Sequence, residues 1–205
     1  MNTIRLSGII TNNPELSHEV KGEKFYKFHL SSVRDSGISD TIPCIASEIF
    51  MAKIAAGIEV TVDGEIRTRN AYDNNTSQTH LQLFVFVTEV LPYFKDVNEV
   101  ELQGYICRKP IYRTTPRGRQ IAETIIAVNR SYAKTSYIPT IVWGRNAVKA
   151  ADMESGMQVK IIGRLQSREY NKVIEGQEIT KTTYELSASC MYVVSDDEEV
   201  EEYAR

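Results

Sequence analysis

Basic side chains gather in one stretch of the chain, where they could bind a polyanion. Five of them crowd a short segment that also holds the ring of Tyr112: Arg108, Lys109, Arg113, Arg117 and Arg119. Five more follow farther along the sequence: Arg130, Arg145, Arg164, Arg168 and Lys172. A guanidinium pairs with phosphate through a planar fork and also stacks on flat rings, whereas an ammonium acts as a point charge. This set therefore favours contact with phosphates.

The charge of the chain is segregated along its length. Residues 1–93 hold 8 Lys and Arg against 11 Asp and Glu, whereas residues 98–194 hold 14 against 9. Residues 195–205 hold one basic side chain against six acidic ones. The formal net charge of −3 therefore conceals a basic middle, which favours a polyanion as partner.

The elements that carry these residues occur twice. A shift of 96 places matches the beginning of the first copy, from Leu6 to Ile45, to the second. A shift of 99 matches the next part, from Gly57 to Arg69, and a shift of 103 matches the closing strands. Representative pairs are Leu6 with Leu102, Gly8 with Gly104, Arg34 with Arg130, Gly64 with Gly163 and Arg69 with Arg168. Shifts that change between elements are typical of a duplicated domain that gained loop residues. We expect two domains, residues 1–93 and 98–194, and an acidic disordered tail at 195–205.

Each copy predicts five strands, with one short helix between the third and the fourth. In the first copy the expected strands are 3–10, 25–33, 40–46, 58–69 and 80–91, with a helix at 47–56 that Ser47 caps and Gly57 ends. In the second copy they are 99–107, 120–129, 137–143, 157–170 and 182–194, with a helix near 145–152. This order is typical of the OB-fold, a small Greek-key barrel in the all-β class. The junction at 91–98 is short and contains Pro92, so we expect the two barrels to sit in a defined relation.

Other classes of protein find little support in the sequence. No apolar run reaches the roughly 20 residues that cross a bilayer, and the first residues do not resemble a signal peptide. We read Cys44, Cys107 and Cys190 as small core residues in a reducing compartment, and we expect a cytoplasmic, nucleoid-associated protein. No phosphate loop, nucleophile motif or metal-ligand spacing occurs, so we expect no enzyme activity, no metal and no cofactor.

At this point a family resemblance enters. The second copy resembles the bacterial and phage single-stranded DNA-binding proteins through its opening at 98–104, Ile125-Ile126-Ala127-Val128-Asn129-Arg130, Ile141-Val142-Trp143-Gly144-Arg145 and the segment 156–170. The first copy resembles the family more weakly, through Leu6-Ser7-Gly8, residues 13–16 and residues 62–69. The chain is also similar to primosomal replication protein N.

The resemblance implies a set of rings on which bases would stack. Matched position by position, these rings are Tyr132, Tyr137, Trp143 and Tyr170, and all four are aromatic. The equivalent positions of the first copy are Ser36, Thr41, Ser47 and Ala71, and only Tyr72 lies nearby. Stacking tolerates any base identity. The resemblance therefore implies sequence-independent binding by the second copy. For Trp143 two interpretations stay open, partial burial in the core and full exposure to the ligand.

The resemblance also suggests partners. Many relatives place four barrels in one particle, which implies a homodimer of this chain, with the first copy serving assembly. The implied setting is DNA replication, recombination or repair, with proteins of those processes as further partners. Two alternatives stay open: an accessory protein that acts mainly through protein contacts, and binding of single-stranded RNA. For the acidic tail, partner recruitment, competition with DNA and a solubility role all remain open.

Overall fold

Strand residues dominate the computed structural model, which describes residues 1–73, 78–131, 133–174 and 177–194. The expected β class is therefore confirmed. Six strands and a 3-10 helix make up the first half: β1 Asn2–Ile10, β2 Glu15–Val20, β3 Glu23–Val33, β4 Ser39–Ser47, η1 Glu48–Lys53, β5 Glu59–Asp73 and β6 Gln78–Leu91. The second half repeats this order: β7 Asn98–Ile106, β8 Ile111–Thr114, β9 Gln120–Arg130, β10 Lys134–Trp143, α1 Arg145–Ala151, β11 Gln158–Ile174 and β12 Gln177–Val193.

Pairings close a ring of five strands in each half. In the first half β1 pairs with β5 and β3, β5 with β6, β6 with β4, and β4 with β3. The corresponding ring of the second half is β7, β11, β12, β10 and β9. The structure adds one strand outside each ring, because the loops expected after the first strand form hairpins in which β2 pairs with β3 and β8 with β9.

Alternation along the strands fills the interior of both rings. Phe28 and Leu30 of β3 and Ile126 and Val128 of β9 point inward and are buried. The buried side chains of the two halves belong to one continuous core. Because each buried Leu, Ile or Phe side chain contributes about 1.5–3 kcal/mol, this core holds both halves together.

Glycines in the fourth strand of each ring allow a sharp bend. The β5–β6 register shifts at Asp63/Gly64, and the β11–β12 register shifts at Ile162/Gly163. A Cβ atom on Gly64 would lie 2.4 Å from the Phe86 carbonyl oxygen, and one on Gly163 would lie 2.3 Å from the Ser187 carbonyl oxygen. No other residue fits so close to the partner strand, as expected for glycine at a bulge.

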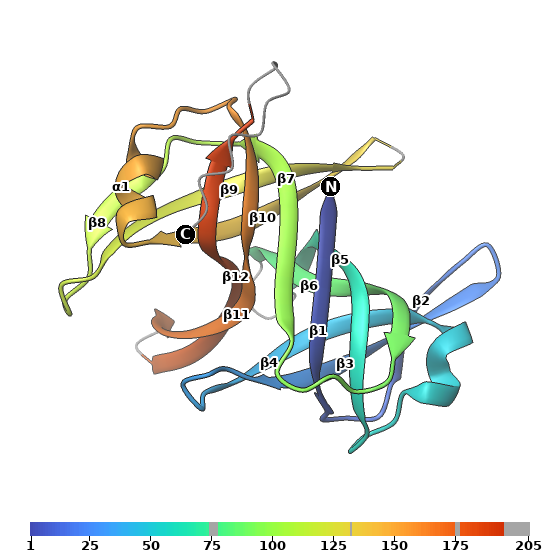
Figure 1. Ribbon diagram of the computed structural model, residues 1–205. Coiled ribbons are helices and arrows are strands. Elements are labelled where there is room, and N and C mark those ends of the chain that lie inside the picture. Colours follow the sequence, from blue (N-terminus) through green and yellow to red (C-terminus); the bar gives the residue numbers. More distant parts are fainter. Residues whose placement is uncertain (74–77, 132, 175–176, 195–205) are drawn as a thin grey trace.

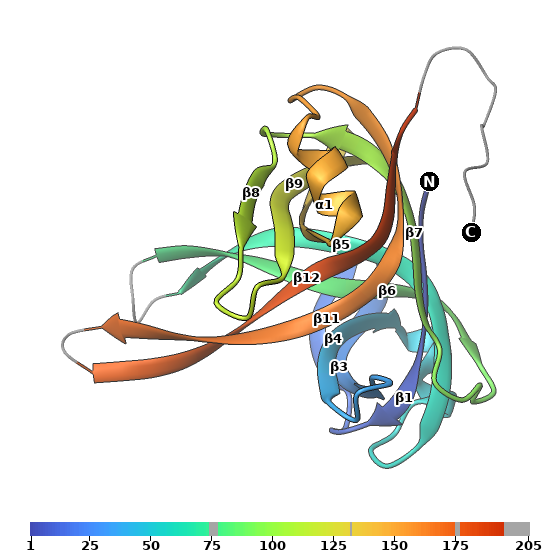
Figure 2. The ribbon, with the colours of Figure 1, turned by 60° about the vertical axis from the view of Figure 1, so that its left-hand side comes forward.

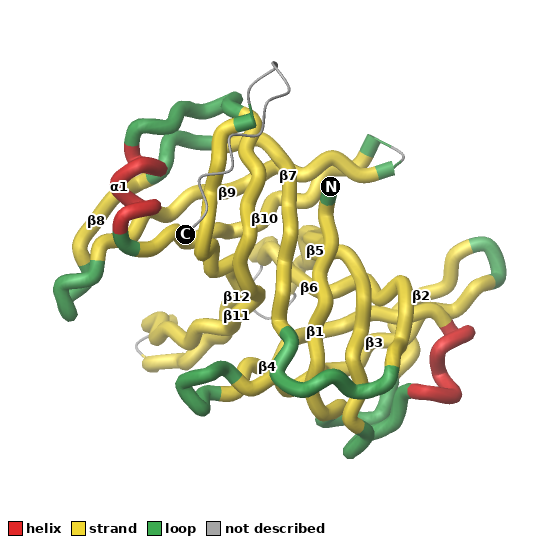
Figure 3. The backbone as a smooth tube through the Cα atoms, viewed as in Figure 1, coloured by secondary structure: helices red, strands yellow, loops and turns green. Residues whose placement is uncertain are grey.

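Each half has one short helix (Figure 3), and the two helices differ in type. The predicted helix at 47–56 is a 3-10 helix that ends at Lys53, four residues before Gly57. Its predicted cap is confirmed, because the Ile49 N–H donates to the Ser47 hydroxyl at 3.4 Å. The α1 helix begins at Arg145 as predicted and ends at Ala151. Within the described ranges, no helix is long and apolar enough to span a bilayer.

A shared sheet joins the two halves (Figure 1). β1 pairs antiparallel with β7, from Asn2 opposite Leu102 to Leu6 opposite Asn98. The connecting turn is tied down as well, because the Ser7 N–H donates to the Val97 carbonyl at 2.8 Å. The short junction therefore holds the halves in a fixed relation. Figure 2 shows that the long hairpins β5–β6 and β11–β12 extend to the same side of the molecule.

Candidate nucleic-acid interface

Trp143 lies on the outer face of the five-strand ring of the second half. The strand registers put Arg113 opposite Ile121 and Ile121 opposite Trp143, so these three side chains form one row across β8, β9 and β10. Trp143 is half-buried, and its indole Nε1–H donates to the Ser187 hydroxyl at 3.0 Å. The indole is thus neither a core residue nor fully exposed: one edge is anchored, and part of the ring is open to solvent.

Two of the predicted tyrosines lie on the same surface, at a distance from Trp143. Tyr137 lies in the same outer row of β10 as Trp143 and is 49% exposed, and Tyr170 lies in the β11–β12 hairpin and is 42% exposed. Tyr137 and Trp143 are six positions apart along β10, which corresponds to about 20 Å. Such a spacing suits a long strand that touches successive rings. Tyr132 lies outside the described residues.

Three of the predicted phosphate-binding cations already have a carboxylate partner. Lys109 pairs with Glu154 at 2.5 Å, Arg113 with Glu123 at 2.8 Å and Arg168 with Glu185 at 3.5 Å. The bond to Arg113 lowers the pKa of Glu123 below its ordinary value despite partial burial. Sequence reasoning missed these acids, because nothing in a strand sequence tells which carboxylate faces which guanidinium.

The other predicted cations are placed more openly. Arg117 and Arg119 lie at the exposed tip of the β8–β9 hairpin, where the Thr115 N–H donates to the Arg119 carbonyl at 2.8 Å. Among the described residues, no carboxylate forms a salt bridge with five of the predicted arginines: Arg108, Arg117, Arg119, Arg145 and Arg164. Arg130 is half-buried at the end of β9. The side chain of Lys172 lies outside the described residues.

Aromatic side chains are also present on the outer face of the first half, at positions that the sequence analysis did not predict. Ile45 is opposite Phe86, and Ile141, its counterpart 96 residues on, is opposite Ser187. Phe86 therefore stands where the second half has the serine that anchors Trp143, so the closing strands correspond at a shift of 101 and not at the predicted 103. Conversely, Ser47 replaces Trp143 and is 6% exposed.

These rings form a stack with arginine. The His18 ring stacks on Phe25 at 5.0 Å between centroids, and Phe25 meets Phe86 at 5.7 Å. The Arg67 guanidinium lies 3.5 Å from the centroid of the Phe86 ring. The sequence analysis compared the first copy only at the positions equivalent to the four rings of the second, and these aromatic side chains lie at other positions. The signal that could have indicated them is the alternation of Phe84 and Phe86 with the buried side chains of Leu83, Val85 and Val87.

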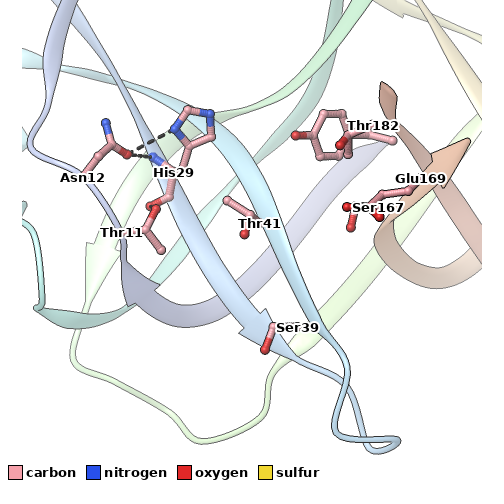
Figure 4. A pocket seen from close by; sticks show the side chains of 9 residues that line it. Thr11, Asn12, His29, Ser39, Thr41, Ser167, Glu169 and Thr182 are labelled. Atoms are coloured by element: carbon pink, nitrogen blue, oxygen red, sulfur yellow. Dashed lines mark hydrogen bonds between the residues drawn. The ribbon is translucent and has the colours of Figure 1, made fainter. Parts of the chain in front are cut away.

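A pocket of about 370 Å³ lies between the halves (Figure 4). Its lining is rich in hydroxyl groups, such as those of Thr41 from the first half and Thr182 from the second. His29 lies on the first-half side, and its ring Nδ1 is 3.1 Å from the Asn12 side-chain oxygen. The lining residues include Glu169 and no Lys or Arg, so this pocket lacks the charge that a phosphate needs.

The cysteines only partly meet the expectation of small core residues. All three are free thiols, but Cys44 alone is buried, whereas Cys190 is half-buried and Cys107 is exposed. Burial raises the pKa of the Cys44 thiol, which keeps it protonated and inert. Within the described residues, no group of three or more His, Cys, Asp or Glu side chains could hold a metal ion.

Comparison with known proteins points to one family. Residues 97–194 match the model of the single-strand binding protein family. Single-stranded DNA-binding protein of Oceanobacillus iheyensis is 36% identical over 95 residues, which are 43% of this chain and 56% of that protein. Single-stranded DNA-binding protein A of Bacillus subtilis is 32% identical over 93 residues, 42% of this chain and 54% of that protein. The match thus spans about half the length of these relatives.

Structural likeness extends over both halves. The wild-type single-stranded DNA binding protein from Thermus aquaticus superposes with a TM-score of 0.74 at 19% identity, covering 95% of this chain and 93% of that one. At this identity the likeness establishes a shared fold. It covers the first half as well, which the family match does not reach.

Proposed function

We propose that this chain, whose residues 97–194 match the model of the single-strand binding protein family, binds single-stranded DNA without sequence preference and without catalysis. The observation that carries the proposal is the outer face of the second half, where Tyr137 and Tyr170 are exposed and Trp143 is half-buried. Arg113 lies in the same row as Trp143, and Arg164 lies opposite Ser187, which binds the indole. Stacking contributes about 1–3 kcal/mol per base for any base identity. Arginines without a carboxylate partner would hold the phosphates between the bases.

The closed rings support a finer interpretation of the fold. We infer that each half is an OB-fold barrel of five strands, to which β2 and β8 add a hairpin strand. The domain bounds that we propose remain 1–93 and 98–194, and the acidic tail at 195–205 lies outside the described residues.

A fluorescence titration with oligo-dT tests the function, since Trp143 is the single tryptophan. We expect DNA to quench Trp143 at low salt. The slope of log affinity against log salt should be about −0.7 per neutralised phosphate. Tyr137→Ala/Tyr170→Ala should weaken binding by at least tenfold, because two stacking surfaces are lost.

The matched control is Tyr137→Phe/Tyr170→Phe, which keeps both rings and should bind like the wild type. Absence of binding to any oligo-dT length would refute the proposal. Binding in which the alanine variant equals the wild type would refute the stacking role of these rings. A shallow salt slope would favour the accessory-protein alternative, in which protein contacts dominate, and tighter binding of oligo-U than of oligo-dT would favour RNA.

We propose two further properties on the same basis. One is a homodimer that brings four barrels together, because the outer face of the sheet exposes Ile162 and Tyr192, which are 43% and 39% accessible. The other is a cytoplasmic, nucleoid-associated location, where replication, recombination and repair proteins would be its partners.

A further inference from the structure

An acidic side chain lies in the middle of the face that the proposed function uses. Glu123 of β9 faces outward between Ile111 of β8 and Ile141 of β10, which are its cross-strand partners. The neighbouring row contains Arg113 and Trp143. Glu123 is therefore one row away from the indole, and Arg113 is its diagonal neighbour. A negative charge at this place repels phosphates, which carry the same sign.

The pair between Arg113 and Glu123 uses one complete edge of the guanidinium. Arg113 Nε donates to Glu123 Oε2 at 3.1 Å, and Arg113 Nη2 donates to Glu123 Oε1 at 2.8 Å. A phosphate needs the same edge, because a guanidinium binds carboxylate and phosphate through the same two parallel hydrogen bonds. The Glu123 carboxylate and a phosphate of the strand therefore exclude each other at this edge of Arg113.

Other arginines reinforce the charge of Glu123. The hydrogen bond from Arg113 has the largest influence on the pKa of the Glu123 carboxyl, and the positive charges of Arg168 and Arg108 act in the same direction. Together they outweigh partial burial and hold this pKa below its ordinary value. Glu123 is therefore ionised at neutral pH and competes for Arg113 with a full negative charge.

The exposure of this pair allows it to open. The side chains of Arg113 and Glu123 are 46% and 28% exposed, and in the described part of the chain Arg113 alone donates a hydrogen bond to the Glu123 carboxylate. Glu185 on the same face differs: it is 5% exposed, accepts from Gln166 at 2.8 Å and lies 3.5 Å from Arg168. Packing and Gln166 hold Glu185 in place, so we assign the competition to Glu123.

The first half has the opposite charge at the equivalent position. The 96-residue shift relates Glu123 to Lys27 and Trp143 to Ser47. Lys27 pairs with Glu15 at 3.0 Å. The acid therefore stands in the half that carries Trp143, although that half is the basic one, and the lysine stands in the half that is acidic. The overall segregation of charge does not account for this exchange, which indicates a local role for Glu123.

We propose that Glu123 is an internal competitor of the bound strand: its carboxylate holds the guanidinium of Arg113 in the place of a phosphate, and this limits how tightly the face binds. The inference rests on the proposed function and deepens it, because it names a residue that sets the affinity of the same site. A strand that binds Arg113 must first displace Glu123, which leaves a carboxylate beside the phosphates. Arg113 thus adds little to the affinity of the wild type.

Glu123→Gln tests the proposal, because it removes the charge of the competitor and keeps the size of its side chain. Arg113 should then be free to bind one more phosphate. We expect the slope of log affinity against log salt for oligo-dT to become steeper by about 0.7, and the affinity at low salt to rise about tenfold. The midpoint of urea denaturation should stay near that of the wild type, because a solvent-exposed ion pair contributes little to stability.

Glu15→Gln is the matched control, because it removes an acid from an exposed ion pair at the corresponding hairpin of the first half and changes the net charge equally. It should keep the wild-type affinity and slope. Glu123→Gln/Arg113→Gln is a second control, which should lose the gain of Glu123→Gln because the freed arginine is absent. An equal rise in Glu15→Gln, or a gain that persists without Arg113, would overturn the inference.

The same titrations separate this inference from the proposed function. A wild type that does not bind oligo-dT would overturn both. A wild type that binds, together with a Glu123→Gln variant that has the wild-type slope, would overturn the inference and leave single-strand binding intact. Glu123→Ala provides a second route if the glutamine variant fails to fold: its slope should also become steeper by about 0.7, and an unchanged slope would again count against the inference.

Discussion

Asp40 shows how much one residue contributes to holding the halves together. Its side chain is 1% exposed, and that of its partner Arg34 is 16% exposed. Burial raises the pKa of the Asp40 carboxyl, but the hydrogen bonds from Arg34 and Ser167 outweigh it, so the pKa lies below its ordinary value. Removing one partner of a buried ion pair lowers stability far more than removing one partner of an exposed pair, because the remaining charge is left buried and uncompensated.

Asp40→Asn should therefore destabilise the protein strongly. We expect a loss of about 3 kcal/mol in the free energy of unfolding at pH 7, measured by urea denaturation. Because the folded-state pKa is depressed, the contribution of Asp40 is present above the ordinary carboxyl pKa and is lost as the pH falls through the folded-state value. The difference between wild type and variant should accordingly shrink in acid.

Asp63→Asn is the matched control for this prediction. Asp63 pairs with Arg5 at 2.6 Å, but the two side chains are 26% and 49% exposed. Solvent screening makes such a pair contribute far less to stability than a buried pair. Equal losses in the two variants would contradict the role that we assign to the buried pair.

At the scale of the element, the bulge at Gly163 governs where Trp143 sits. The bulge brings β11 against the Ser187 carbonyl, and the Ser187 hydroxyl anchors the Trp143 indole. Gly163→Ala would force these strands apart, since its Cβ would lie 2.3 Å from that oxygen. We expect a loss of about 1–3 kcal/mol in unfolding free energy and a red shift of Trp143 emission as the ring loses its anchor.

Gly118→Ala provides the comparison for that variant. Gly118 has a φ of +74° at the β8–β9 tip, and a Cβ there meets no atom within 4 Å. The variant carries only backbone strain of about 1 kcal/mol and should leave Trp143 emission unchanged. A Trp143 spectrum altered equally by both variants would show that the bulge does not position the indole.

The same elements show what could be predicted from the sequence. Period-two alternation and the internal repeat indicated the strands of both rings, and Ser47 was confirmed as a cap. The short strands β2 and β8 were missed, because both are exposed and carry no inward-facing apolar row. The carboxylates of Glu123 and Glu185 and the stack at Phe86 depend on register across strands, which a single sequence does not contain.

At the scale of the whole molecule, the proposed homodimer predicts which face joins the two chains. Ile162 is 43% exposed on β11, and Glu101 and Cys190 are its cross-strand partners. An isologous contact through this face would bury Ile162 at the centre. We expect the wild type to sediment as a dimer at micromolar concentration and Ile162→Glu to sediment as a monomer.

Ile38→Glu is the control for the dimer, because Ile38 is 57% exposed near the turn between β3 and β4, in the other half of the molecule. It should remain dimeric. A monomeric wild type, or dimers that persist in Ile162→Glu, would exclude this face as the contact between chains.

The pairing of β1 with β7 has a consequence for dilution. Both strands belong to one chain, so their association is unimolecular and has an effective concentration that the tether sets, independent of how much protein is present. A contact between two chains follows mass action and weakens as the protein is diluted. Dilution can therefore separate chain from chain, but every chain that remains folded still presents its two halves side by side.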